Sequence, residues 1–353
     1  MSGRRSRRDV LGGIAASVLA SQFTKGSAAE PASTAVTREL IAAAKREGQV
    51  AWYTAVDLPV AERIAKAFEA GYPGVAVSVE RSGGERIFQR IGQEYGSNIH
   101  AVDVVNSSDE AHFHSWKRQG LLASYLPEVV ASHYPAEHRD PDGHFASWRL
   151  WLCVIGYNTK QVTAEEAPKS YADLLDPKWA GKIVKAHPGY SGTIMTATCQ
   201  IARDLGWQYF EKLSRQRVMQ VQSSADPPKK LALGERAVMA DGNEYNLVQL
   251  KEKGEPVAIV YPDEGTPVIV GPSAVMREAP HPNAARLLQS FMFSRECQQL
   301  LVDWGGLRSV HPLVAEKAGR RPLSTIKLMK GDPAAVEEQA EQIKAHYLRY
   351  FRV

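Results

Sequence analysis

Short apolar segments alternate with amphipathic ones along most of this chain, and that alternation restricts its fold more than any other feature. The segments 49–54, 74–80 and 101–108 have the composition of buried strands, and helical spacing of apolar residues separates them at 59–70 and 84–95. A run of strand, helix, strand, helix and strand is typical of a parallel sheet, because parallel neighbours need long crossover connections. We therefore predict an α/β fold.

The second half of the chain continues the same pattern. We predict further strands at 148–159, 181–188, 235–242, 256–262 and 266–276. We predict helices at 37–47, 191–206, 281–306 (as two helices) and 332–347, and a helix followed by a turn at 171–179. No internal repeat or low-complexity tract interrupts the pattern. This is enough chain for one large or two medium domains.

The first 29 residues have the features of an export signal. They combine the arginine pair Arg7 and Arg8, a short apolar run over 10–20, and small residues at Ser27 and Ala29. The apolar run is far shorter than the roughly 20 residues of a membrane-spanning helix. The three parts together are typical of a cleaved signal peptide, and the arginine pair resembles the twin-arginine export motif. We predict cleavage near Ala29 and a periplasmic location.

The charge of the chain argues against a nucleic-acid-binding protein, and its cysteine content argues against a disulfide-rich one. The whole chain carries a formal net charge of +4, but much of the excess lies in the predicted leader, and the mature chain is near neutral. No basic patch for nucleic acid is therefore expected. Cys153, Cys199 and Cys297 are odd in number and far apart, which argues against a disulfide framework. Cys153 lies in an apolar strand and is predicted to be a buried hydrophobe, with a nucleophilic role as the alternative.

Four phrases carry a resemblance to a known family. They are "VAWYTAVD", "AVDVVNSSDEAHF", "SYADLLDPKWAGKIVKAHPGYSGT" and "GEPVAIVYPDEGTPVIVGPSAVM", in this order. Together they resemble the bacterial extracellular solute-binding proteins of family 1. The resemblance is to the branch that contains the periplasmic ferric-iron-binding proteins and their phosphonate-binding relatives. It covers essentially the whole mature chain.

The resemblance implies a two-lobed periplasmic-binding-protein fold of type II. Two crossing strands would join the lobes, and the ligand would lie in the cleft between them. We place the first lobe at 36–148 plus 267–315 and the second at 149–266 plus 316–353. It also implies a monomer without a required cofactor, which would deliver its solute to an ABC-type permease in the inner membrane.

The candidate ligand-binding residues follow predicted strands, because ligands of such folds bind beyond the carboxyl ends of strands. In the first lobe they are Thr54, Asp57, Arg81, Ser82, Ser107 and Ser108, and in the second they include Ser191, Gly192, Thr193 and Ser223. The turn at 191–193 opens a helix, where free backbone N–H groups and two hydroxyls suit an anionic oxygen group. Plain capping of the helix by Ser191 is the alternative.

The segment 241–246 bears on the choice of ligand. Ferric-binding members of the family carry adjacent tyrosines here, whereas this chain has Glu244 and Tyr245. An Fe(III) site with a synergistic anion could form from Asp57, Glu244 and Tyr245, because carboxylate and phenolate oxygens suit a hard cation. The pattern favours a small phosphonate-like or carboxylate anion, with Tyr245 as a hydrogen-bond donor and Arg81 neutralising charge.

One further interpretation concerns a pair of histidines. His112 and His114 lie two apart on a predicted helix, where they do not face the same side, and we expect a helix surface rather than a metal site.

The predicted function is the substrate-binding component of an importer. An exported enzyme with this fold, which would need a nucleophile such as Cys153, and a binding protein that serves a receptor are the alternatives.

Overall fold

The computed structural model describes residues 33–352. The predicted export signal, residues 1–29, lies outside the described residues. The helices are α1 (Arg38–Glu47), α2 (Leu58–Gly71), α3 (Gly84–Gly96), α4 (Glu110–Arg118), α5 (Glu128–His133), α6 (Gly192–Leu205), α7 (Trp207–Ser214), α8 (Asp226–Ala232), α9 (Glu244–Glu252), α10 (Pro282–Phe293), α11 (Arg295–Asp303) and α12 (Pro333–Phe351). The strands are β1 (Ser33–Thr34), β2 (Gln49–Thr54), β3 (Ala76–Arg81), β4 (Val104–Asn106), β5 (Leu126–Pro127), β6 (Ala146–Asn158), β7 (Ile183–Ala186), β8 (Met219–Val221), β9 (Val238–Asn243), β10 (Val257–Val260) and β11 (Val268–Val275).

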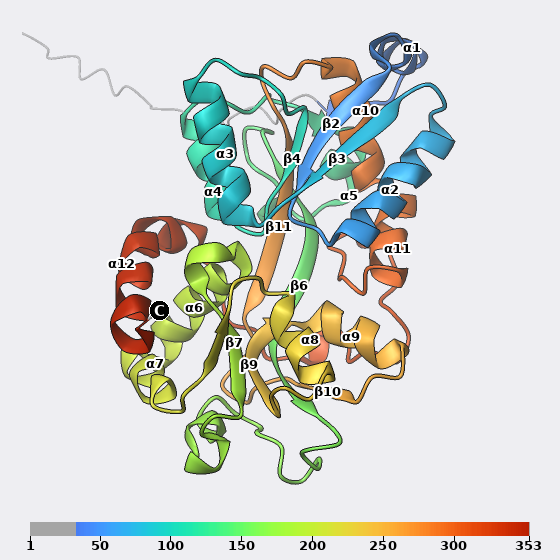
Figure 1. The fold of residues 1–353 in the computed structure, drawn as a ribbon. Helices are drawn as coiled ribbons and strands as arrows, with labels where there is room; N and C mark the ends of the chain where they lie inside the picture. Colours follow the sequence, from blue (N-terminus) through green and yellow to red (C-terminus); the bar gives the residue numbers. More distant parts are fainter. Residues whose placement is uncertain (1–32, 353) are drawn as a thin grey trace, which may run out of the picture. The chain divides into compact units, whose positions relative to one another are not determined.

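Nine of these strands form one mixed sheet. Its order is β3-β2-β4-β11-β6-β9-β7-β8, with β10 paired to β6. The strands β3, β2 and β4 are parallel to one another, as are β9, β7 and β8, whereas β11 and β6 are antiparallel to their neighbours. The long strands β6 and β11 therefore connect two groups of elements (Figure 1). We call the group around β2–β4 the first lobe and the group around β7–β9 the second lobe.

Local sequence signals explain where several elements begin and end. The Thr37 side chain accepts a hydrogen bond from the Leu40 N–H and caps α1, and Gly48 ends that helix with φ of 74°. The prediction of a helix followed by a turn at 171–179 is wrong in its helical part: two 3-10 turns, Asp173–Leu175 and Pro177–Trp179, occupy the segment. Pro177 has no N–H to donate, so an α-helix cannot continue through it.

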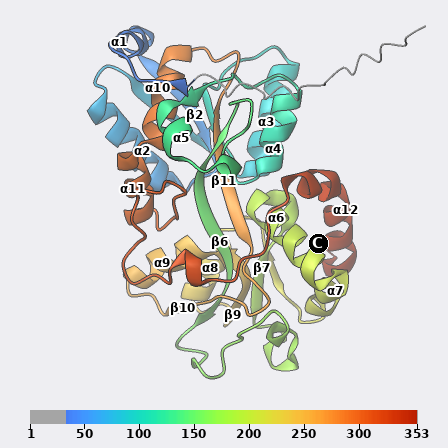
Figure 2. The ribbon, with the colours of Figure 1, turned by 180° about the vertical axis from the view of Figure 1, so that it is seen from behind.

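Each lobe has its own apolar core. In the first lobe Trp52 and Phe68 are fully buried where α1, α2 and α10 cover the sheet. In the second, Ile183 and Val238 of the sheet are buried in one cluster with Phe210 of α7. The helix α12 packs on α6 and α7 and also contacts α4 of the first lobe (Figures 1 and 2).

The lobe boundaries predicted from the sequence stay a prediction. Among the described residues, no helix is both long and apolar enough to cross a membrane.

The strand directions determine where loops from both lobes meet. All three parallel strands of the first lobe end level with one another, at Thr54, Arg81 and Asn106. In the second lobe β7, β8 and β9 end at Ala186, Val221 and Asn243. The loops that follow these strands line one common pocket, described next.

Candidate functional site

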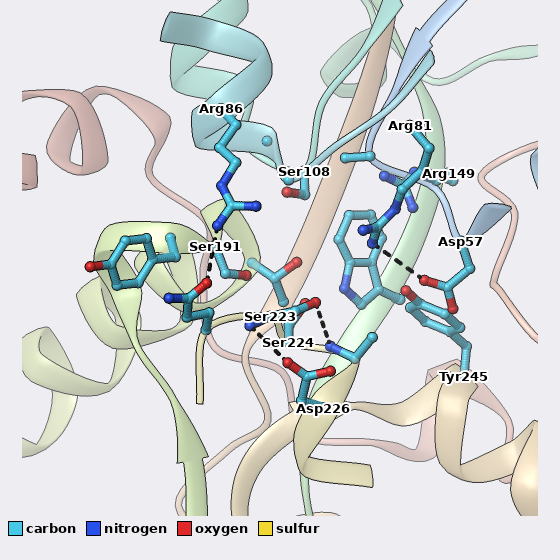
Figure 3. Close-up of a pocket in the computed structure, with 18 residues that line it drawn as sticks. Asp57, Arg81, Arg86, Ser108, Arg149, Ser191, Ser223, Ser224, Asp226 and Tyr245 are labelled. Carbon is cyan, nitrogen blue, oxygen red and sulfur yellow. Dashed lines mark hydrogen bonds and ion pairs between the residues drawn. The ribbon is translucent and has the colours of Figure 1, made fainter. Parts of the chain in front are cut away.

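A pocket of about 260 Å³ lies where the loops of the two lobes meet (Figure 3). Its lining comes from the ends of β2, β3, β4, β7, β8 and β9 and from the face of β6. The lining residues are Ala55, Asp57, Arg81, Gly83, Gly84, Arg86, Ser108, Arg149, Trp151, Tyr190, Ser191, Thr193, Gln222, Ser223, Ser224, Ala225, Asp226 and Tyr245. The set contains three arginines, two aspartates and several hydroxyls, so the pocket is polar with a cationic excess.

Arg149 is the least ordinary of these residues. It lies within β6, is 1% exposed, and its guanidinium carbon lies 4.4 Å from the centroid of the Trp151 ring. Neither its Nε nor its Nη2 has a hydrogen-bond partner among the described residues. Burial lowers the pKa of Arg149 to about 10, although Tyr245 and Asp57 oppose that shift. The side chain therefore stays charged at neutral pH, with donors that no protein group uses.

The other two arginines already have partners. The Arg81 Nη2 lies 3.7 Å from Asp57 Oδ1, and the Arg81 Nε donates to the Val56 carbonyl at 3.4 Å. The Arg86 Nη2 of the first lobe donates to Gln222 Oε1 of the second lobe at 3.0 Å. Both arginines can still turn donors towards a ligand, because a guanidinium carries five N–H groups.

Asp57 and Tyr245 lie on the same side of the pocket as Arg81 and Arg149 (Figure 3). The Asn246 side-chain amide donates to Asp57 Oδ2 at 2.7 Å and so connects the lobes. The Tyr245 hydroxyl accepts a hydrogen bond from Asn243 Nδ2 at 3.1 Å. Burial and then the Asp57 charge raise the pKa of Tyr245 well above its usual range. Tyr245 is therefore a neutral phenol that can donate its proton in a hydrogen bond to a ligand.

Two helix N-termini face the same pocket. The helix α3 starts at Gly84 after the cap residue Gly83, and α6 starts at Gly192 after Ser191. The Ser191 side chain accepts from the Ile194 N–H at 3.5 Å, so the predicted capping occurs and Ser191 also lines the pocket. Free N–H groups at a helix start and the helix dipole both favour a bound anion.

Gly192 permits a close approach between α6 and the start of α4, and this leads to a testable expectation. A Cβ at Gly192 would lie 2.9 Å from the Asp109 Cβ and 3.0 Å from the Ser108 Oγ. We expect Gly192→Ala to cost about 1–3 kcal/mol of unfolding free energy through overpacking. It should also weaken anion binding several-fold, because the two pocket walls are pushed apart.

Thermal unfolding and sulfate titration of the purified protein would measure both effects. Gly92→Ala is a matched control, because Gly92 lies within α3 and a Cβ added there would have no neighbouring atom within 4 Å. That control should be more stable by about 0.5–1 kcal/mol and bind sulfate normally. Unchanged binding by Gly192→Ala would contradict the expectation.

The structure brings seven of the twelve predicted ligand-binding residues to the pocket: Asp57, Arg81, Ser108, Ser191, Thr193, Ser223 and Tyr245. Thr54, Ser82, Ser107, Gly192 and Glu244 are not among its lining residues. Thr54 is fully buried and its Oγ1 accepts from the Val56 N–H at 3.2 Å. Ser107 is also fully buried, and its hydroxyl contacts His112. These two hydroxyls shape the loops that carry the pocket residues.

The placement of Glu244 corrects the predicted ligand set. Its carboxylate is fully buried away from the pocket and pairs with Arg308 at 2.8 Å and Arg320 at 2.5 Å. The Tyr261 hydroxyl donates to it as well, at 2.5 Å. Burial opposes ionisation, but the hydrogen bonds and charges of the two arginines outweigh it and lower the Glu244 pKa. Glu244 is a structural anion, so Asp57 and Tyr245 are left from the three predicted Fe(III) ligands.

The histidine pair also differs from its prediction. The two side chains do face different sides of α4, as expected, but His112 is buried at 5% exposure rather than lying on the surface. It forms a cluster with Glu85 and Asp109, and a second cluster of metal-ligand type contains Asp140, Asp142 and His144. Within residues 33–352 these are the two groupings of at least three histidine, cysteine or carboxylate donors, and neither includes the pocket's Asp57.

The buried position of Cys153 agrees with its prediction as a small hydrophobe. Its side chain is fully buried and lines no part of the pocket. Burial raises the pKa of its thiol well above the usual value, so the reactive thiolate does not form near neutral pH.

The sequence analysis did not predict six further residues that line the pocket: Arg86, Arg149, Trp151, Tyr190, Gln222 and Asp226. For Arg149 a signal existed, because it is the single charge in the apolar segment 148–156.

The chain is similar in sequence to known bacterial binding proteins. A family model described as bacterial extracellular solute-binding protein matches residues 100–327. A probable ABC transporter periplasmic-binding protein of Sinorhizobium fredii is 24% identical over 286 residues, which cover 78% of this chain and 74% of that protein.

Solved structures extend the likeness to most of the chain. The periplasmic binding protein AfuA from Actinobacillus pleuropneumoniae, with fructose-6-phosphate bound, matches with a TM-score of 0.79 at 23% identity, covering 87% of this chain and 99% of that one. Iron-bound HitA from Pseudomonas aeruginosa matches with a TM-score of 0.74 at 23% identity, covering 85% of this chain and 99% of that one. These matches confirm the predicted α/β periplasmic-binding-protein fold.

Proposed function

Because this chain belongs to the bacterial extracellular solute-binding proteins, and is therefore a binding protein rather than an enzyme, we propose that it captures a small anionic solute in the interlobe pocket. The solute carries a phosphonate-like or carboxylate group. The protein delivers it to an ABC-type permease of the inner membrane. This role agrees with the relative from Sinorhizobium fredii, which is a probable ABC transporter component.

The unpartnered Nε and Nη2 of the buried Arg149 are the observation that carries this proposal. A buried charge without a hydrogen-bond partner destabilises a protein, unless a ligand supplies the missing partner. Arg149 lies in the pocket wall with two idle donors, near Arg81 and the hydroxyl of Ser108 (Figure 3). An oxyanion with two or three oxygens fits these donors, because arginine binds such groups in a bidentate manner.

A phosphoryl-type group is favoured over a bare metal ion by the pocket's charge. The lining contains three arginines, which would repel a ferric ion, and Tyr245 is held as a neutral phenol. The related structure AfuA holds fructose-6-phosphate, a phosphate ester, whereas HitA holds iron. Asp57 and Tyr245 keep Fe(III) with a synergistic anion as the competing ligand, and the experiment below separates the two.

The leader and the assembly state complete the proposal. We propose that residues 1–29 direct twin-arginine export, that cleavage follows near Ala29, and that the mature monomer works in the periplasm. A near-neutral mature chain without nucleic-acid contacts is consistent with that role. No cofactor is needed for it.

Thermal unfolding with a panel of ligands tests the proposed ligand class. The panel contains phosphate, methylphosphonate, small carboxylates, and Fe(III) with and without carbonate. An anion at about one hundred times its dissociation constant should add about 2–3 kcal/mol to the unfolding free energy. Tyr245→Phe should reduce that gain, because it removes a donor to the anion and leaves the ring.

Two outcomes of this experiment would contradict the proposed ligand or the proposed role of Tyr245. If Fe(III) stabilises the protein and produces a purple phenolate colour that Tyr245→Phe removes, while none of the anions alone has an effect, the iron assignment replaces ours. If an anion stabilises both forms equally, Tyr245 is not part of the site.

A further inference from the structure

A buried polar cluster lies directly behind the pocket wall, and the proposed function does not use it. It contains Glu85 in the first turn of α3, Asp109 at the cap of α4, and His112 within α4. The His112 Nδ1 lies 2.8 Å from Ser107 Oγ, and its Nε2 lies 3.0 Å from Glu85 Oε1. Asp109 Oδ2 is 3.9 Å from the same Nε2. His112 therefore connects the loop after β4 with the start of α3.

The two segments that His112 connects are the ones that carry pocket residues. Ser108 lies between Ser107 and Asp109, and Gly84 and Arg86 flank Glu85. The segments also touch each other, because a Cβ at Gly84 would lie 2.8 Å from Ser108 Oγ. The Phe88 ring stacks on the imidazole with centroids 4.5 Å apart and fixes its plane. A change at His112 is thereby transmitted to both anion-binding segments.

We propose that His112 is a positioning residue of the anion pocket, which holds the loop of Ser107 and Ser108 against the first turn of α3 and makes anion affinity fall as the pH rises. This inference rests on the proposed function, because it assumes an anionic solute. His112 itself touches no ligand, since it does not line the pocket.

The groups that face His112 determine its charge. They are Glu85 from α3, Asp109 at the cap of its own helix and Lys344 from α12. Glu110 of α4 and Cys199 of α6 lie near Asp109 and act on that carboxylate. Burial opposes the charged imidazole, but Asp109 and Glu85 outweigh it and raise the pKa of His112 above 6.5. Burial raises the pKa of Asp109 to about 6. Cys199 stays neutral, because burial raises its pKa to about 11.

The sign of the pH effect follows from these directions. Below the raised pKa, the imidazolium donates to both Ser107 and Glu85 and adds a positive charge behind the pocket. As the pH rises through that pKa the charge is lost, and Asp109 loses its proton at a lower pH. Each step makes the wall more negative and weakens the binding of an anion. One unit charge in a partly solvated site should change affinity roughly threefold to tenfold.

Sulfate is a suitable probe, because its own charge does not change between about pH 5 and 9. Its dissociation constant would be measured over that range from the fluorescence of Trp151 and its neighbours. We expect wild-type affinity to fall roughly threefold to tenfold with rising pH. His112→Gln keeps an amide donor but cannot titrate, so it should bind sulfate with a much flatter profile. His112→Phe should bind more weakly at every pH.

His114→Gln is the matched control, because His114 lies on the same helix with its side chain 40% exposed. It should keep the wild-type profile. An unaltered slope in His112→Gln would overturn the inference. So would stoichiometric Zn²⁺ binding that His112→Phe abolishes, because the three donors would then be a metal site.

An NMR titration of the His112 imidazole reads its protonation without any ligand. A pKa at or below 6.5 would overturn the inference whatever anion binds. If instead the imidazole titrates above that value but neither sulfate nor any anion of the panel binds wild-type protein, the proposed function fails on its own ground.

Discussion

Replacing Arg149 with methionine should strongly weaken anion binding without destabilising the protein. Truncating one partner of a buried, hydrogen-bonded charge pair costs about 2–5 kcal/mol, which corresponds to a dissociation constant higher by about 30-fold to 5,000-fold. Stability should be equal or higher, because Arg149 is 1% exposed with Nε and Nη2 unpaired in the protein alone. A buried charge without a partner is a cost that methionine removes.

Isothermal titration with the best anion of the panel, together with thermal unfolding without ligand, measures both halves of this expectation. Arg86→Met is the control, because Arg86 lines the same pocket from an exposed position and pairs with Gln222. Its loss should weaken binding only several-fold. Arg149→Lys tests geometry, since an ammonium keeps the charge but loses the planar fork. Wild-type affinity in Arg149→Met, or a large loss of stability, would show that the arginine serves the fold instead.

The sequence was a good guide to the sheet for a physical reason. Apolar segments such as 49–54 and 148–159 lie close to β2 and β6, because a strand buried on both faces must be apolar throughout. The failure at 171–179 is equally physical. Its leucines and aromatic residues have helical spacing, but Pro177 removes a donor and divides the segment into two 3-10 turns.

The site was predictable where it depends on strand ends and not where it depends on long-range partners. Asp57, Arg81 and Ser108 follow parallel strands, so strand direction alone brings them to one edge. Arg149 comes from the face of a crossing strand, a source that this rule does not consider.

Glu244 and Tyr245 show a different limit. Both residues begin α9, where successive side chains point about 100° apart, so only one of them can face the pocket. The choice between them is made by Arg308 and Arg320, more than sixty residues away along the chain, which pair with Glu244. Local sequence around 241–246 carries no information about those partners.

Glu244→Gln should be among the most destabilising single substitutions in this protein. The carboxylate is fully buried and pairs with two arginines whose side chains are 2% and 3% exposed. Breaking a buried pair by removing one partner costs about 3–5 kcal/mol, because the remaining charge stays uncompensated. Arg308 and Arg320 come from the segment after α11, so the loss should loosen that segment from α9. Urea unfolding monitored by circular dichroism would measure the effect.

Glu316→Gln is the matched control, because Glu316 also pairs with Arg308, at 3.3 Å, but from a side chain that is 44% exposed. It should cost at most about 1 kcal/mol, as exposed pairs do. Equal effects of the two substitutions would show that Glu244 is not the anchor of this network.

The pH dependence of the Glu244→Gln difference provides an independent check. Because the folded pKa of Glu244 is lowered from 4.5, its stabilising contribution is complete above the unfolded pKa and disappears as the pH falls through the folded one. The gap in unfolding free energy between wild type and Glu244→Gln should therefore be wide at pH 7 and narrow steadily below about pH 4.5. A gap that stays constant down to about pH 3 would mean that the lost stability comes from packing, not from the charge of Glu244.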